Sequence, residues 1–191
     1  ERRGAKGRTQ EIERLVARSL RAAVDLEELG PIALNVDCDI LNADGGTRCA
    51  SITAANLALR LGVRRLIAAG VCLPKNMRPT EEQRRSGWSP PALSEEEQMA
   101  HEMRVMEHDV AAISVGLIDG KSYLDLDYNL DSNADVDMNV VKVSNGAFVE
   151  VQGTGEESTY QRQELDALLD MADIGFEALF EMQKTILHGQ Q

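Results

Sequence analysis

The sequence has 191 residues, of which 43% are apolar and 27% are charged, and its net charge is −12. This mixture is typical of one globular domain with its own core, and no apolar run is long enough to span a bilayer. We therefore expect no membrane partner. The first residues do not resemble a signal peptide, and the three cysteines form no CxxC pair, so we expect a reducing compartment, the cytoplasm.

Charge is distributed unevenly along the chain. Residues 1–21 contain seven basic and three acidic residues, whereas acidic residues gather at Glu95–Glu97 and over residues 125–137. A net charge of −12 by itself argues against a nucleic-acid ligand. A clustered basic segment nevertheless attracts phosphate backbones, so charge placement leaves RNA open as a partner.

The first part of the chain predicts a helix, a strand and a second helix. Helical periodicity covers residues 9–28, where Thr9 is a candidate cap. Alternating apolar residues predict a half-buried strand over residues 32–40. The next helix is expected from Thr47 to about Ala69. Residues 70–93 contain four prolines and are expected to form an irregular loop.

A short helix is expected after this loop. Ser94 followed by Glu97 has the spacing of a capping box, which marks a helix start. Methionines recur on one face of the helix at Met99, Met103 and Met106. Methionine more often fills a core than binds a cofactor, so we expect this face to be buried.

The remainder of the chain predicts two hairpins and a long helix. Asp119-Gly120 and Asn145-Gly146 each separate two strand-like runs, a typical turn signal. Helical periodicity returns over residues 161–187. The order of elements predicts one α+β domain in which helices pack on a mixed sheet.

A glycine-rich loop is the first candidate binding site. The run Asp44-Gly45-Gly46-Thr47-Arg48 lies between the predicted strand and the second helix. Glycines let a backbone approach an oxyanion, and the free N–H groups of a helix start favour phosphate. Arginine adds a two-pronged donor for phosphate oxygens. Taken alone, a glycine turn at this position serves structure more often than binding.

A cluster of aspartates is the second candidate site, at Asp125, Asp127, Asp131, Asp135 and Asp137. Partly buried carboxylates repel one another, and a bound cation holds them together. An EF-hand is excluded because its glycine position holds leucine and its final glutamate position holds valine. Acidic strand ends and turns remain the alternative for Asp125, Asp127 and Asp135, of which we expect less than of the other two.

Six stretches in order resemble the ribonuclease PH family of phosphorolytic 3′-to-5′ exoribonucleases. They are residues 7–15, 37–52, 112–116, 125–128, 131–141 and 149–154. The resemblance implies a ribonuclease PH-like domain. It also implies that the family's N-terminal strands are missing from this chain, and that residues 73–108 form a longer, more acidic loop-helix insertion.

The resemblance assigns roles to particular residues. The phosphate-binding positions of the family fall on Arg8, Gly46, Thr47 and Arg48. The paired aspartates fall on Asp131 and Asp137, which would hold Mg²⁺ or act in acid catalysis. The basic stretch Arg2, Arg3 and Lys6 would line the RNA approach.

The resemblance also implies an activity. Inorganic phosphate, as co-substrate, attacks the last phosphodiester of RNA, typically the 3′ end of precursor tRNA, and a nucleoside diphosphate leaves. The family implies a homo-oligomer, a hexameric ring. Because the family's N-terminal strands are missing, a separate N-terminal piece of the same protein is a further possible partner. The alternative is a non-catalytic ring subunit that scaffolds an exosome-like assembly. The arginines and paired aspartates favour the enzyme.

Overall fold

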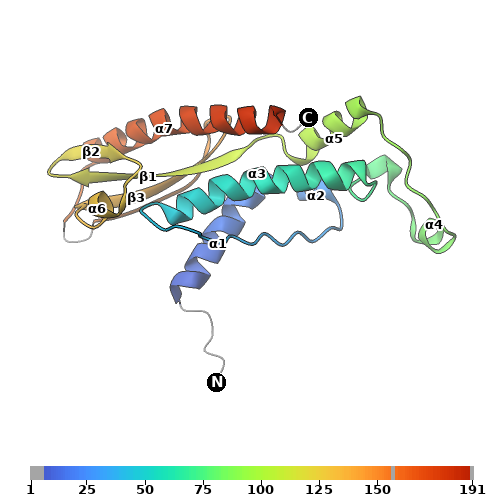
Figure 1. Ribbon diagram of the computed structural model, residues 1–191, viewed down its shortest axis with the longest axis horizontal. Coiled ribbons are helices and arrows are strands. Elements are labelled where there is room, and N and C mark those ends of the chain that lie inside the picture. The colour runs from blue at the N-terminus through green and yellow to red at the C-terminus, as the bar shows by residue number, and fades with distance from the viewer. Residues whose placement is uncertain (1–6, 156–157, 190–191) are drawn as a thin grey trace, which may run out of the picture.

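A computed structural model describes residues 7–155 and 158–189 (Figure 1). The elements, in chain order, are α1 (Gly7–Ala22), α2 (Leu26–Leu29), α3 (Thr47–Ala68), η1 (Lys75–Met77), α4 (Glu81–Arg85), α5 (Glu95–Val105), β1 (Val110–Ile118), β2 (Lys121–Leu124), α6 (Tyr128–Asp131), β3 (Val136–Val143), β4 (Phe148–Gly155) and α7 (Arg162–His188). Among the described residues, no helix combines the length and apolar character that crossing a membrane requires.

The four strands form one sheet in the order β2-β1-β3-β4. All three neighbouring pairs are antiparallel, so the predicted α+β class is confirmed but the mixed sheet is wrong. Both predicted hairpins are present. Gly120 and Gly146 take positive φ angles of 73° and 90° in their turns, a region that glycine enters without steric cost. The hairpins make the β1–β2 and β3–β4 pairs antiparallel, and β1 and β3 pair antiparallel as well, although no hairpin joins them.

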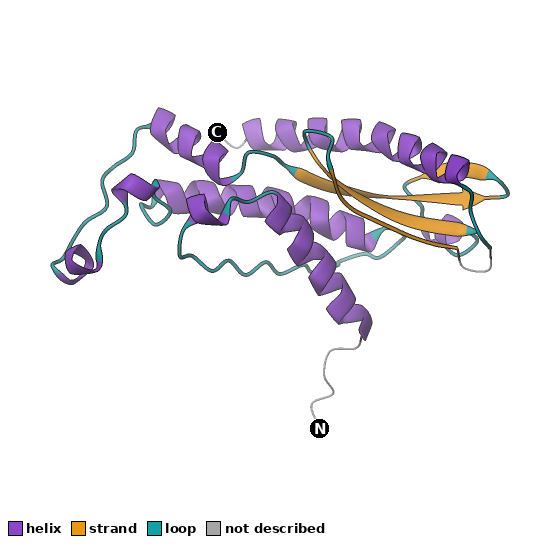
Figure 2. Cartoon of the chain, turned by 180° about the vertical axis from the view of Figure 1, so that it is seen from behind, coloured by secondary structure: helices purple, strands orange, loops and turns teal. Residues whose placement is uncertain are grey.

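Helices cover both faces of the sheet (Figures 1 and 2). Side chains alternate between the two faces of a strand. On β3, Val136, Met138 and Val140 pack with Leu168 and other apolar residues of α7. The opposite face, which includes Val141, joins the core of α1 and α3. The predicted final helix is confirmed as α7. The odd-numbered residues of β3, which include Asp137, thus lie on the face that α3 covers.

The predicted helix over residues 9–28 is two helices. Asp25 accepts hydrogen bonds from the backbone N–H groups of Glu27 and Glu28, at 2.8 and 3.0 Å. These bonds cap a new helix, α2, so the chain turns between Ala22 and Leu26. Helix α1 begins at Gly7, which means that Thr9 lies inside it and does not cap it.

The predicted strand over residues 32–40 is absent from the described structure. A strand needs the backbone of a neighbour, and no described strand lies beside this segment. Ile32 and Leu34 pack against the core, whereas Val36 and Ile40, and Leu41 just after the segment, are uncovered at 38%, 44% and 94% exposed. The apolar residues do alternate in the sequence, but the described residues contain no strand that pairs with this segment.

Residues 73–105 form an arm that extends from one end of the domain and returns through α5 (Figure 1). The predicted capping box is confirmed, because Ser94 and Glu97 bond reciprocally. The buried methionine face is wrong for Met99 and Met103, which are 55% and 52% exposed. Helix α5 instead packs through a polar residue, Glu102, which pairs with two arginines of α3.

Candidate active site

The glycine-rich loop is held tightly against the β2–α6 connection. A Cβ on Gly45 would lie 1.8 Å from the carbonyl oxygen of Leu126, so only glycine fits. Gly46 has φ +65°, and a Cβ there would lie 3.1 Å from Ser114 Oγ. Both positions therefore require glycine. Gly45 closely approaches the backbone of Leu126, and Gly46 closely approaches Ser114 of strand β1.

The loop opens the 22-residue helix α3 with its first turn uncapped by a side chain. Gly46 is the N-cap and Thr47 the first helical residue. The first N–H groups of a helix have no partner within it, and the helix dipole adds partial positive charge there. Thr47 and Arg48 thus offer backbone donors to an anion at the position that the sequence predicts.

Arg48 is connected to two other elements through Glu11 of α1. One guanidinium nitrogen, Nη2, donates to Glu11 Oε2 at 3.2 Å. The second carboxylate oxygen, Oε1, accepts from Gln152 Nε2 of β4 at 3.1 Å. Arg48 Nε is buried without a hydrogen-bond partner among the described residues. Helices α1 and α3 and strand β4 therefore converge on this arginine.

Arg8 lies one helical turn before Glu11, so the two share a face of α1. Arg8 is exposed and makes no ion pair with any described residue. Since Glu11 reaches Arg48, the turn of α1 that carries Arg8 lies beside the start of α3. The convergence of these two distant segments fits the expected anion site, and anion binding itself stays a prediction.

Asp137 lies on the sheet face that α3 covers. It is half-buried on β3, opposite Gly116 of β1 and Thr154 of β4. Two residues further along the same face, Asn139 Oδ1 accepts a hydrogen bond from the Cys49 thiol in the first turns of α3, at 3.0 Å. The structure therefore places Asp137 close to the N-terminal end of α3.

Asp131 is exposed at the last position of α6. This helix is attached to the glycine-rich loop, because the N–H of Tyr128 donates to Asp44 Oδ1 at 2.6 Å. Asp127 has a structural role here, since its side chain caps α6 through the N–H of Leu130 at 2.8 Å. The two predicted carboxylates thus come from separate elements that border the same loop.

Whether these carboxylates suit a metal depends on the donor set. No group of three or more His, Cys, Asp or Glu side chains that could hold a metal occurs in the described ranges. Mg²⁺ nevertheless binds through one or two carboxylates completed by waters and substrate phosphates. Binding of Mg²⁺ by Asp131 and Asp137 therefore stays a prediction.

Several residues of this site were missed or ranked lower from the sequence. Asp125 has φ +55°, and its Oδ1 lies 3.9 Å from the Cβ position of Gly46, although we expected less of it than of Asp131 and Asp137. Glu11 and Gln152 are 141 residues apart, so no local pattern links them. The thiol next to Arg48 is not a nucleophile, because burial raises the pKa of Cys49 to about 12.

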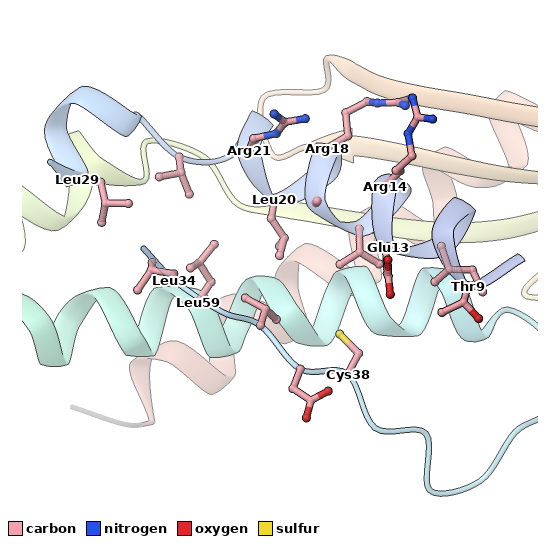
Figure 3. Close-up of a pocket in the computed structure, with 16 residues that line it drawn as sticks. Thr9, Glu13, Arg14, Arg18, Leu20, Arg21, Leu29, Leu34, Cys38 and Leu59 are labelled. Carbon is pink, nitrogen blue, oxygen red and sulfur yellow. The ribbon is translucent and has the colours of Figure 1, made fainter. Parts of the chain in front are cut away.

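The predicted RNA-contacting residues Arg2, Arg3 and Lys6 lie outside the described residues. The basic stripe continues on α1 with Arg14, Arg18 and Arg21, of which Arg18 pairs with Glu150 of β4 at 2.5 Å. Below this stripe, α1 and the uncovered residues 34–38 border a groove of about 1050 Å³ (Figure 3).

Comparison with known proteins identifies the family. Sequence models of the 3′ exoribonuclease family match its domain 1 at residues 1–62 and its domain 2 at residues 108–175. This chain belongs to the 3′ exoribonuclease family. Proteins named ribonuclease PH from Corynebacterium efficiens and Corynebacterium diphtheriae are 46% and 47% identical over 182 residues, 95% of this chain. The chain spans 62% and 63% of the length of these relatives.

Solved structures support the same fold. Rice (Oryza sativa) Rrp46 superposes with a TM-score of 0.60 at 12% identity, covering 97% of this chain and 68% of that one. A chain of the Archaeoglobus fulgidus exosome with RNA bound to the active site gives 0.53 at 18% identity, covering 90% and 59%. At these identities the likeness shows the fold of the 3′ exoribonuclease family in this chain and carries no residue roles.

Proposed function

We propose that this chain is the larger part of a phosphate-dependent 3′-to-5′ exoribonuclease that trims precursor tRNA and other RNAs. One observation carries the proposal: the uncapped start of α3, with Gly46, Thr47 and Arg48, lies beside the sheet face that holds Asp137. An anion site next to a carboxylate is the arrangement that phosphoryl transfer uses, because the reaction needs positioning and charge neutralisation. The ribonuclease PH relatives support the same activity.

The proposed reaction balances without an oxidant or reductant. An oxygen of inorganic phosphate forms a bond to the phosphorus of the last phosphodiester, and the bond from that phosphorus to the 3′-oxygen breaks. The shortened RNA leaves with a 3′-hydroxyl that has gained a proton, and the terminal nucleotide leaves as a nucleoside diphosphate. Arg8, Arg48 and the N–H groups of Thr47 and Arg48 hold the attacking phosphate in this account.

Asp131 and Asp137 have the complementary role. When Mg²⁺ is bound, it supplies positive charge that offsets the charge of the scissile phosphate. Asp131 and Asp137 would hold this ion, and one of them would instead deliver the proton to the leaving 3′-oxygen if it acts as a general acid. The half-buried position of Asp137 suits either role, since water screens its charge less than that of an exposed carboxylate.

RNA binding is assigned to the basic end of the chain despite the net charge of −12. Arg2, Arg3 and Lys6 precede Arg8 directly, and exposed Arg14 and Arg21 extend the basic stripe along α1. Counterion release makes such binding salt-dependent. RNA affinity measured across a salt series should therefore fall steeply; an affinity that does not change with salt would exclude this assignment.

We propose that a further protein segment fills the groove between α1 and residues 34–38. The strand predicted over residues 32–40 is absent from the described structure. Apolar Leu34, Val36 and Leu59 border the groove together with α1 (Figure 3). The relatives have further sequence that this chain does not span. We assign the groove to N-terminal strands of the same protein, whether continuous with this chain or a separate piece. In this proposal residues 1–191 form a single domain with an insertion at residues 73–108, and the N-terminal strands pack on it.

The proposal also covers assembly and location. Relatives of this fold occur in exosome structures, which supports an oligomeric ring, and we propose a hexamer as in the sequence-based expectation. The three free cysteines fit a reducing compartment, the cytoplasm. The alternative function, a non-catalytic ring subunit, keeps the fold and the ring but needs neither Arg48 nor Asp137.

One experiment separates the two functions. The purified full-length protein is incubated with a 3′-extended RNA, with and without inorganic phosphate. An enzyme shortens the RNA and releases nucleoside diphosphates only when phosphate is present. A scaffold binds RNA and leaves its length unchanged under both conditions.

A further inference from the structure

Glu11 connects three elements at the proposed anion site. Its Oε2 accepts from Arg48 Nη2 of α3 at 3.2 Å, and its Oε1 accepts from Gln152 Nε2 of β4 at 3.1 Å. We propose that Glu11 is a positioning residue, which holds the Arg48 guanidinium ready for phosphate. This inference rests on the proposed function and adds a residue to which the family comparison gives no role.

The contacts of Glu11 are those of a fixed side chain. Each carboxylate oxygen receives one donor, one from α3 and the other from β4. Helix α1 is itself anchored to β4 two turns further on, because Arg18 pairs with Glu150. The Glu11 and Arg48 side chains are 40% and 26% exposed, so water screens this pair less than a fully exposed one.

Positioning matters because arginine has a long, flexible side chain. Ordering it when a ligand binds costs conformational entropy, and fixing it in advance removes that cost from the binding step. Glu11 occupies only one of the five guanidinium donors. Nε is buried, so the donors left to an anion are the remaining ones on the two terminal nitrogens, Nη1 and Nη2.

Charge balance points the same way. One phosphate contacted by both Arg8 and Arg48 requires two positive groups to lie close together before the anion arrives, and like charges repel. Glu11 lies one helical turn from Arg8 and forms an ion pair with Arg48, so its negative charge offsets the repulsion between the two arginines. Its own charge is compensated by the two donors, which reduces its repulsion of phosphate.

The test compares Glu11→Gln with the control Glu177→Gln in the full-length protein. Glu177 is exposed on α7, across the sheet, and its substitution changes the net charge by the same amount. Glutamine at position 11 keeps the side-chain shape but loses the charge. For each protein we would measure the thermal midpoint, kcat and the KM for phosphate at saturating RNA.

We expect Glu11→Gln to raise the phosphate KM on the order of tenfold, with kcat within about twofold and the thermal midpoint unchanged. Glu177→Gln should match the wild type. A merely structural Glu11 would lower the midpoint and leave the KM unchanged, which would overturn the inference. A lowered KM would overturn it as well, because Glu11 would then compete with the anion.

A double variant shows whether Glu11 acts through Arg48. If it does, adding Glu11→Gln to Arg48→Ala should raise the KM no further, since residues acting through one contact are non-additive. Additive effects would contradict the inference. If the wild type shows no phosphate dependence at all, the proposed function itself fails, and that outcome is distinct from an unchanged KM in Glu11→Gln.

Discussion

The carboxylate of Asp44 accepts a hydrogen bond from the backbone N–H of Tyr128 at 2.6 Å. This bond joins the glycine-rich loop, which opens α3, to the first residue of α6, which ends at Asp131. Residues 84 apart in sequence are thereby placed side by side. The glycine-rich loop and the acidic segment of the proposed site are coupled through this contact and through the packing of Gly45 against Leu126.

Replacing Asp44 should loosen α6 without unfolding the domain. Loss of a side-chain acceptor at a helix start costs about 1 kcal/mol, which corresponds to roughly fivefold in rate if the contact acts in the transition state. We expect Asp44→Ala to lower kcat by about this factor. Asp44→Asn keeps an acceptor oxygen and should retain most activity. Equal activity of Asp44→Ala and the wild type would show that the position of α6 does not matter.

Replacing Arg48 should weaken phosphate binding. A charge-assisted hydrogen bond contributes about 1.5–3 kcal/mol, so we expect Arg48→Ala to raise the phosphate KM roughly tenfold or more. Arg65 is exposed on the same helix and provides a control of the same type. An unchanged phosphate KM in Arg48→Ala would remove this arginine from the anion site.

Replacing Asp137 should abolish most catalysis and leave the fold intact. Asp137→Asn keeps the shape but removes the charge that binds a metal, or the proton that a general acid delivers. General acid catalysis alone contributes about 100-fold or more, so kcat should fall by at least that factor. The exposed Asp170 of α7 offers a matched control, Asp170→Asn. Near-normal kcat in Asp137→Asn would make this carboxylate structural.

The arm should depend on a buried ion pair for its attachment. Arg60 Nη1 donates to Glu102 Oε1 at 3.0 Å, and both side chains are under a tenth exposed. Glu102→Ala leaves Arg60 with Asp109 as its remaining ionic partner and should cost about 3 kcal/mol of unfolding free energy. Calorimetry should show a midpoint lower by about 6–12 °C. The exposed Glu96 serves as a control, and a stable Glu102→Ala would contradict this account of α5.

Local signals in the sequence identified most elements correctly. Asp119-Gly120 and Asn145-Gly146 predicted both hairpins because a tight turn depends on the residues within it. The break at Asp25 was missed, because its cap works through the N–H groups of α2 and does not disturb the apolar periodicity. The strand over residues 32–40 could not be decided locally, since its pairing depends on a neighbour.

The site was harder to predict than the fold. The sequence predicted Gly46 and Arg48 as candidates because a glycine-rich loop before a helix is a local pattern, and phosphate binding there stays a prediction. It did not reveal the Glu11–Gln152 contact, which exists only after α1 packs on β4. The sequence could not reveal the proximity of Asp125 to Gly46 either, because it depends on how the end of β2 meets α3.

The central claim is that inorganic phosphate attacks RNA and remains in the product. The direct test is incubation of the full-length protein with 3′-extended RNA and ³²P-labelled phosphate, followed by separation of the released nucleotides. We predict nucleoside diphosphates that carry the label in their β-phosphate, and a loss of this product in Asp137→Asn. Release of unlabelled nucleoside monophosphates, or no release with a properly folded protein, would contradict the account.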